Sequence, residues 1–252
     1  RVRVRERERA RARERELGLG SGIGRGEVTV WCWKLQHYEG KEQQIMSILE
    51  YNGGDVVAMK GKNCVVIVTD TRYGIRNQTI ACDFPKVFRM NSRAYVGLTG
   101  LATDIQTVHE RLQFRMKMYK LKEGREMGPR VLGNVVSSIL YERRFGPYFV
   151  EPVVCGLEVD GDDVKPYISA YDLIGAGCFA DDFVVSGTSS EALYGLCESL
   201  YKPDMTAEET FEVASQCLLA AVNRDAVSGW GAQAYIIEKE KTTIRKLQGR
   251  MD

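Results

Sequence analysis

Residues 56–68, VVAMKGKNCVVIV, place two short apolar runs on either side of the segment Lys60-Gly61-Lys62-Asn63. Short apolar runs separated by a polar, glycine-containing turn are typical of a β-hairpin. Further strand-like runs follow at residues 86–90 and 93–98. We therefore expect strands to open the organised part of the chain.

Helical periodicity replaces the strand pattern after residue 100. Apolar residues recur at helical spacing from Leu101 to Tyr119, and the pattern Thr103-x-x-Gln106 predicts a capping box at the start of this helix. A second helix is predicted to start near Pro129, because proline suits the first helical turn. The two helices follow each other directly, as a pair.

The same alternation of strands and paired helices then repeats. Strand-like runs occupy residues 149–157, 164–171 and 183–186, and the acidic turn 160–163 joins the first two. Helices are predicted over about 189–201 and after a Thr206-x-x-Glu209 capping box, before a final strand pair at 233–238 and 242–247. Helices in pairs, rather than singly between strands, favour antiparallel sheets. The prediction is an α+β fold, a four-layer αββα sandwich.

Charge and composition exclude several classes of function. The 35 basic and 34 acidic residues leave a net charge of +1, which gives no long-range attraction to nucleic acid or to a membrane. The two histidines, His37 and His109, have no other ligand at chelating spacing, so neither a metal nor a cofactor is expected. Seven widely spaced cysteines indicate buried thiols in a reducing compartment. With no long apolar run and no signal-peptide pattern, we expect the cytoplasm and nucleus.

Residues 1–45 differ in composition from the rest. Residues 1–17 alternate arginine with valine, glutamate or alanine, and residues 18–26 are rich in glycine. This composition predicts a disordered, solvated extension, because it offers little apolar surface to bury. A nucleic-acid-binding arm is the weaker reading, because the glutamates cancel most of the arginine charge. Another hypothesis is that residues 1–17 come from DNA upstream of the true start of the gene, because translation of a dinucleotide repeat gives such a strict two-residue alternation. We expect the folded domain to be residues 46–252.

Several strings in this domain resemble the beta subunits of the 20S proteasome, and the beta type-3 group most closely. The likeness runs from Met46 to Asp252 and rests on the strings YNGG (51–54), MKGKNCV (59–65), TDTRYG (69–74), GLTGLATD (97–104), RRFGPY (143–148) and RDAVSG (224–229). The resemblance implies the N-terminal-nucleophile hydrolase fold, which is an αββα sandwich and agrees with the layer order above. It also implies a place in the particle that carries out ubiquitin-dependent protein degradation.

Active members of this family attack the peptide bond with the hydroxyl of an N-terminal threonine. The resemblance places Gly54 at the threonine position, and glycine has no side-chain oxygen. The neighbouring Asp55 cannot substitute, because a carboxylate brings charge where a neutral hydroxyl has to be activated. The chain is therefore expected to be a non-catalytic subunit without catalytic residues. The remaining vestigial active-site positions are Asp70, Lys86, Thr188, Asp225 and Ser228.

These retained residues also have purely structural interpretations, which we favour. Asp70 could pair with Arg72 at a strand end, and Lys86 could neutralise Asp70 inside the sandwich. Asp225 and Ser228 suit a turn, where their side chains satisfy backbone groups.

Two other functional classes stay open from the sequence. One is an active threonine-type peptidase whose nucleophile is Ser47, Thr69 or Thr71, although each of these is internal and lacks a free α-amine. The other is a free-standing scaffold or chaperone-like protein outside the proteasome.

The resemblance also implies partners. These are the beta type-2 and beta type-4 subunits as ring neighbours, the alpha ring and the opposite beta ring. Asp172 matches a family aspartate that lines the substrate pocket of the adjacent beta type-2 subunit, where a carboxylate favours basic side chains. The alternative is that Asp172 only caps its own loop.

Overall fold

The computed structural model describes residues 48–161 and 163–251, which lie in a unit that spans Met46–Asp252. The prediction of a disordered extension over residues 1–45 concerns residues outside these ranges and stays a prediction.

The hairpin predicted from residues 56–68 lies at the centre of the first of two five-stranded sheets. Strands β1 (Asp55–Gly61) and β2 (Cys64–Asp70) pair antiparallel, and Asn63 closes their turn with a φ of 60°, which asparagine tolerates. Three antiparallel strands extend this sheet to the order β10-β1-β2-β11-β12: β10 (Phe183–Gly187), β11 (Ala232–Ile237) and β12 (Thr242–Leu247).

The second sheet is also antiparallel throughout, with the order β5-β6-β7-β8-β9. Its strands are β5 (Val87–Arg89), β6 (Ala94–Gly100), β7 (Val150–Asp160), β8 (Asp163–Tyr171) and β9 (Gly177–Phe179). A separate small hairpin pairs β3 (Tyr73–Ile75) with β4 (Gln78–Ala81).

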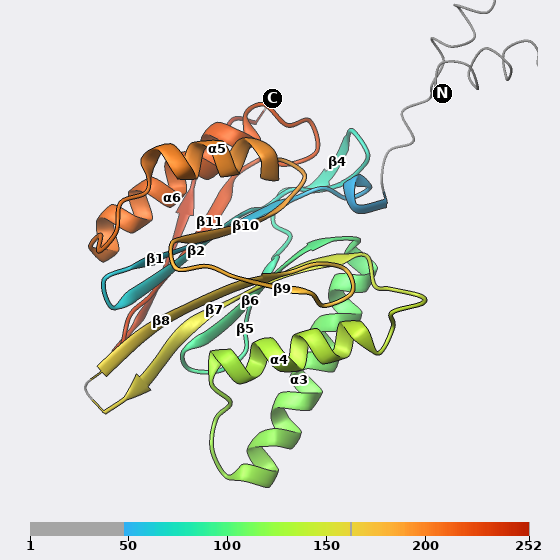
Figure 1. Cartoon of the computed structure of the whole chain (residues 1–252). Helices are drawn as coiled ribbons and strands as arrows, with labels where there is room; N and C mark the ends of the chain where they lie inside the picture. The colour runs from blue at the N-terminus through green and yellow to red at the C-terminus, as the bar shows by residue number, and fades with distance from the viewer. Residues whose placement is uncertain (1–47, 162, 252) are drawn as a thin grey trace, which may run out of the picture. The chain divides into compact units, whose positions relative to one another are not determined.

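Two pairs of helices cover the outer faces of the sheets (Figure 1). Helices α3 (Ala102–Glu123) and α4 (Pro129–Tyr141) pack on the second sheet. Helices α5 (Ser190–Leu200) and α6 (Ala207–Val222) pack on the first. One short 3₁₀ helix, η1 (Ile48–Glu50), precedes β1.

Three buried clusters fill the spaces between these four layers. One lies between the first sheet and its helices, and a second lies between the other sheet and its helices. The third joins the two sheets, with Val56 and Ile67 of the first sheet in the same cluster as Tyr95 and Cys155 of the second. Strand β2 is buried at all seven positions because it has packed neighbours on both faces. The predicted αββα sandwich is confirmed.

The two predicted capping boxes have opposite outcomes. At the start of α6, Glu209 N donates to Thr206 Oγ1 and Thr206 N donates to the Glu209 carboxylate, so this box is confirmed. The box at Thr103 is wrong, because α3 starts at Ala102 after Leu101, which makes no side-chain cap. Asn52 provides the acceptor instead: its Oδ1 receives the Ala102 N–H at 2.9 Å.

The expected burial of the cysteines is only partly right. Within the described residues all six cysteines are free thiols, and Cys64, Cys155, Cys197 and Cys217 are buried. Cys82 and Cys178 are exposed, because Cys82 follows the small β3–β4 hairpin and Cys178 lies on the short edge strand β9. The prediction of burial is wrong for these two.

Candidate functional site

The chain enters β1 through Gly53 and Gly54, both in conformations that require glycine. Their φ angles are 69° and 129°, values that residues with side chains rarely adopt. A Cβ atom added to Gly54 would lie 2.4 Å from Lys86 Cε and 3.0 Å from its Nζ. The space in which a side chain of residue 54 would begin is therefore filled by Lys86.

Lys86 and Asp70 form a fully buried ion pair next to Gly54. Lys86 Nζ lies 2.7 Å from Asp70 Oδ1, and it also donates to the carbonyl oxygen of Arg72 at 2.8 Å. The two side chains are 1% and 0% exposed. Each charge compensates the other in a region from which water is excluded, as the structural interpretation of Lys86 predicts.

The Asp70 carboxylate also binds backbone groups from three segments. Its Oδ1 accepts from Asp55 N at 2.9 Å, and its Oδ2 accepts from Gly229 N at 3.2 Å and Arg72 N at 3.3 Å. Asp70 thus ties the start of β1 to the loop that precedes β11. A carboxylate with this many donors holds the local backbone in one arrangement.

The guanidinium of Arg72 does not pair with Asp70, so the proposed Asp70–Arg72 ion pair is wrong. It donates instead to the carbonyl oxygens of Val227 and Arg76, both at 2.8 Å, and to Thr79 Oγ1 at 2.9 Å. Burial lowers the pKa of Arg72 from its ordinary value. The cation that pairs with Asp70 is Lys86, at 2.7 Å, while the Arg72 guanidinium is satisfied by the oxygen acceptors named above.

Thr188, Asp225 and Ser228 form a second polar group near Gly54. Asp225 Oδ2 accepts hydrogen bonds from the hydroxyls of Thr188 and Ser228, the latter at 2.7 Å. Thr188 N donates to the carbonyl oxygen of Gly54 at 3.2 Å, which connects this group to the start of β1. Asp225 Oδ1 accepts from Val227 N, the turn-stabilising contact that the structural interpretation predicts. The structure thus brings together all six positions predicted as a vestigial site.

Asp55 is a further site residue, which sequence reasoning considered only as a replacement nucleophile. It is 0% exposed, and its two carboxylate oxygens contact Ser189 N at 2.8 Å and Ser189 Oγ at 2.6 Å. Burial, and then the nearby Asp70 carboxylate, raise the pKa of Asp55 to about 7. No sequence pattern indicates this pairing, because Asp55 and Ser189 are 134 positions apart.

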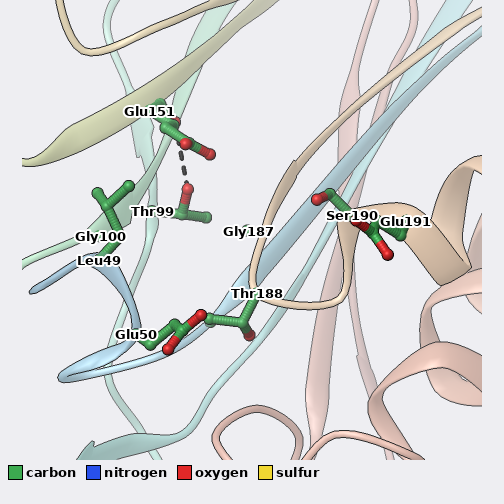
Figure 2. A pocket seen from close by; sticks show the side chains of 10 residues that line it. Leu49, Glu50, Thr99, Gly100, Glu151, Gly187, Thr188, Ser190 and Glu191 are labelled. Atoms are coloured by element: carbon green, nitrogen blue, oxygen red, sulfur yellow. Dashed lines mark hydrogen bonds between the residues drawn. The ribbon is translucent and has the colours of Figure 1, made fainter. Parts of the chain in front are cut away.

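A polar cavity of about 250 Å³ opens over Gly54 (Figure 2). Thr99 and Glu151 lie on one side of it, and Ser190 and Glu191 on the other. Thr99 Oγ1 contacts Ser186 Oγ at 2.6 Å and the Glu151 carbonyl oxygen at 3.3 Å, while burial raises the pKa of Glu151. The cavity therefore has hydroxyl and carboxylate walls, and Gly54 contributes no side chain to it.

The alternative nucleophiles gain no support from their surroundings. Thr69 is 2% exposed, and its hydroxyl donates to the carbonyl oxygens of Asp55 and Asp70 at 3.0 and 3.1 Å. The Thr71 hydroxyl donates to the carbonyl oxygen of Trp230 at 3.2 Å. Ser47 lies outside the described residues. Hydroxyls inside the chain that serve as structural donors have no free α-amine to activate them.

Asp172 is separate from the six grouped positions and lies in the turn between β8 and β9. Its Oδ1 accepts from Ile174 N at 3.0 Å and from Ala176 N at 2.7 Å. These are the contacts of the predicted loop cap. The side chain is nevertheless exposed, so these bonds leave it available to a neighbouring molecule.

In the part of the chain that the structure describes, no three His, Cys, Asp or Glu side chains are grouped as metal ligands. No helix among the described residues has the length and apolarity needed to span a bilayer.

The profile of the family described as "Proteasome subunit" matches residues 50–237 of this chain. The chain belongs to the proteasome subunit family. It is 54% identical over 207 residues to the proteasome subunit beta type-3 of Dictyostelium discoideum, covering 82% of this chain and 100% of the relative. It is 56% identical, with the same coverage, to the beta type-3-A subunit of Arabidopsis thaliana and to the beta type-3 subunit of Drosophila melanogaster. The resemblance inferred from the strings is confirmed.

Proposed function

We propose that this member of the proteasome subunit family is a non-catalytic beta subunit of the 20S core, with Gly54 at the position of the nucleophilic threonine. The observation that carries the proposal is the geometry at Gly54: φ is 129°, and Lys86 fills the space where a side chain would begin. Threonine-type catalysis needs a hydroxyl and a free α-amine at one residue. Residue 54 offers no hydroxyl, and its nitrogen is part of the peptide bond to Gly53.

The retained polar residues then hold the fold together. Asp70, Lys86 and Arg72 join β2 to the segments that lead into β1 and β11 through buried hydrogen bonds. A buried polar network of this kind fixes one local arrangement when all its members are satisfied. In a subunit that cuts nothing, this arrangement would preserve the shape required for assembly.

The proposed partners are the beta type-2 and beta type-4 subunits as ring neighbours, the alpha ring and the opposite beta ring. Support comes from the beta type-3 relatives, each of which is aligned along its whole length. A ring of unlike subunits closes only if each member offers two different faces to its neighbours. This subunit would therefore support ubiquitin-dependent protein degradation by enclosing the chamber.

Asp172 is proposed to line the substrate pocket of the neighbouring beta type-2 subunit. Its Oδ1 is bound by the N–H groups of Ile174 and Ala176, which holds the exposed carboxylate in one orientation. An oriented carboxylate at a pocket wall favours lysine or arginine side chains.

The proposed location is the cytoplasm and the nucleus. The free thiols of Cys64, Cys155, Cys197 and Cys217 support a reducing compartment. Fractionation of cells followed by detection of the native chain tests this, and recovery of the chain in a secretory fraction would contradict it.

Affinity purification of the tagged full chain, followed by identification of the co-purifying subunits, tests the proposed function. Alpha and beta proteasome subunits should be recovered together with peptidase activity, whereas the matched purification of untagged chain should recover neither. Recovery of the chain alone, or with unrelated proteins, would contradict the proposal and favour a free-standing scaffold.

A further inference from the structure

We infer that the turn Arg143–Gly146 inserts Phe145 into an apolar pocket bordered by carboxylates on another subunit of the same particle. This inference rests on the proposed function, because it requires assembly into a proteasome. It adds a contact surface and the chemistry of the partner surface that fits it.

Phe145 is 98% exposed, the largest exposed fraction of any large apolar side chain among the described residues. Scattered apolar side chains on a surface are ordinary, but they usually pack partly against their own chain. Phe145 makes almost no such contact. Burial of a fully exposed aromatic ring by a partner surface removes the most apolar area from water and so contributes the most binding free energy.

The turn that carries Phe145 is held by successive backbone hydrogen bonds. Arg143 N donates to Leu140 O, Arg144 N to Tyr141 O and Gly146 N to Arg143 O, each at 3.0 Å. In Figure 1 this loop projects beyond the C-terminal end of α4 before the chain returns as β7. A turn ordered before binding loses little conformational entropy when it docks, which favours a specific contact.

The charges beside Phe145 indicate the chemistry of the partner. Arg143 and Arg144 precede the ring, and within the described ranges neither forms an ion pair with a carboxylate. The Arg144 guanidinium lies 5.5 Å from the centre of the Phe145 ring, so the positive charge accompanies the apolar group. A pocket that receives this turn should therefore be apolar at its base and acidic at its border.

The surface beside the turn is also suited to protein contact. A groove of about 520 Å³ runs between α3 and α4, and Glu142 at its edge leads directly into the turn. Phe114, which lines this groove, is 61% exposed. The ion pair between Arg115 and Glu142, at 3.1 Å, joins the two helices across the groove. A partner that buries Phe145 can therefore extend its contact over an apolar side chain on a fixed surface.

The test is a competition for places in the particle, with the full chain and its natural partner subunits. Parent chain and Phe145→Ala chain, carrying different tags, are expressed at equal levels, and their ratio in the purified particle is measured. We expect Phe145→Ala to be about tenfold under-represented. Phe145→Leu, which keeps an apolar group, should compete almost as well as the parent. The double variant R143E/R144E should also be under-represented, because its carboxylates would face the acidic border of the partner pocket.

Several outcomes would overturn the inference. Equal representation of Phe145→Ala and parent would show that the ring is not buried by a partner. Full competition by R143E/R144E would exclude an acidic border. A lower thermal stability of the isolated Phe145→Ala chain would indicate a role within its own fold. If the parent chain itself fails to enter the particle, the proposed function fails as well, which separates that result from the others.

Discussion

Asp55 and Asp70 are two buried carboxylates that lie close together, but the cation of Lys86 contacts only Asp70. Ser189 donates to both carboxylate oxygens of Asp55, and burial together with the nearby Asp70 carboxylate raises the pKa of Asp55 from 3.8 to about 7. Between these two pH values the folded protein keeps a proton that the unfolded chain has released. Its free energy of unfolding therefore falls as pH rises through this window.

Replacement of Asp55 by asparagine should remove this pH dependence. The amide can accept from Ser189 N and donate to Ser189 Oγ, so it imitates the protonated acid. The variant should be more stable than the parent above pH 7, by up to about 4 kcal/mol, and similar to it near pH 4. Urea unfolding of both chains across this range measures the difference. If the free energy of unfolding of both chains rose equally from pH 4 to pH 7, the account would be contradicted.

Removing one partner of the buried Lys86–Asp70 pair should destabilise the chain more than replacing both partners. Lys86→Met leaves the Asp70 carboxylate buried without its cation, so the chain should lose about 3–5 kcal/mol. The double variant with Asp70→Asn should recover part of that loss, because no unpaired charge remains. Thermal unfolding of the parent, both single variants and the double variant measures the coupling. Additive losses in the double variant would show that the two residues do not act as a pair.

At the scale of helices and strands, the capping boxes give a direct comparison. Thr206 caps α6 with two reciprocal hydrogen bonds, so Thr206→Ala should destabilise the chain by about 1 kcal/mol. Thr103 lies inside α3, whose first N–H is satisfied by Asn52, so Thr103→Ala is a matched control and should change little. Chemical unfolding of both variants measures this. Equal losses would mean that the start of α3 has been wrongly assigned.

Elements marked by an apolar pattern could be predicted from the sequence, including the three-residue strand β5 within the run 86–90, whereas three other short strands could not. Helices α3 to α6 bury residues at helical spacing, such as Ile105, Val108 and Leu112 in α3. Strands β3, β4 and β9 have only three or four residues, of which Gly74 alone is buried, so no apolar pattern marks them in the sequence. The cap of α3 was missed for another reason: its acceptor, Asn52, lies 50 positions away in the chain.

Part of the candidate site was also predicted, but from the resemblance to a family and not from apolar patterns. Its six positions came from the resemblance to proteasome subunits, because neither periodicity nor charge singles out Gly54 or Thr188. The pairing of Asp55 with Ser189 and the hydrogen bonds of Arg72 could not be predicted. They join segments that become neighbours only when the two sheets and the loop before β11 pack together.

At the scale of the whole molecule, Asp172 gives a prediction about the assembled particle. Asp172→Asn keeps a side-chain oxygen that can accept from Ile174 N and Ala176 N, so the loop should keep its shape. The lost negative charge should lower cleavage after basic residues several-fold, with other peptidase activities unchanged. Peptidase assays on purified particles with three classes of substrate measure this. An unchanged profile would leave Asp172 as a loop cap only.

The central claim, that residue 54 cannot start a proteolytic attack, is tested most directly by a reagent that reacts with N-terminal threonines. Particles that contain the full chain are treated with a peptide epoxyketone, and every subunit is then weighed by mass spectrometry. We predict adducts on the active beta subunits and an unmodified mass for this chain, because Gly54 has no hydroxyl. An adduct on this chain would contradict the claim.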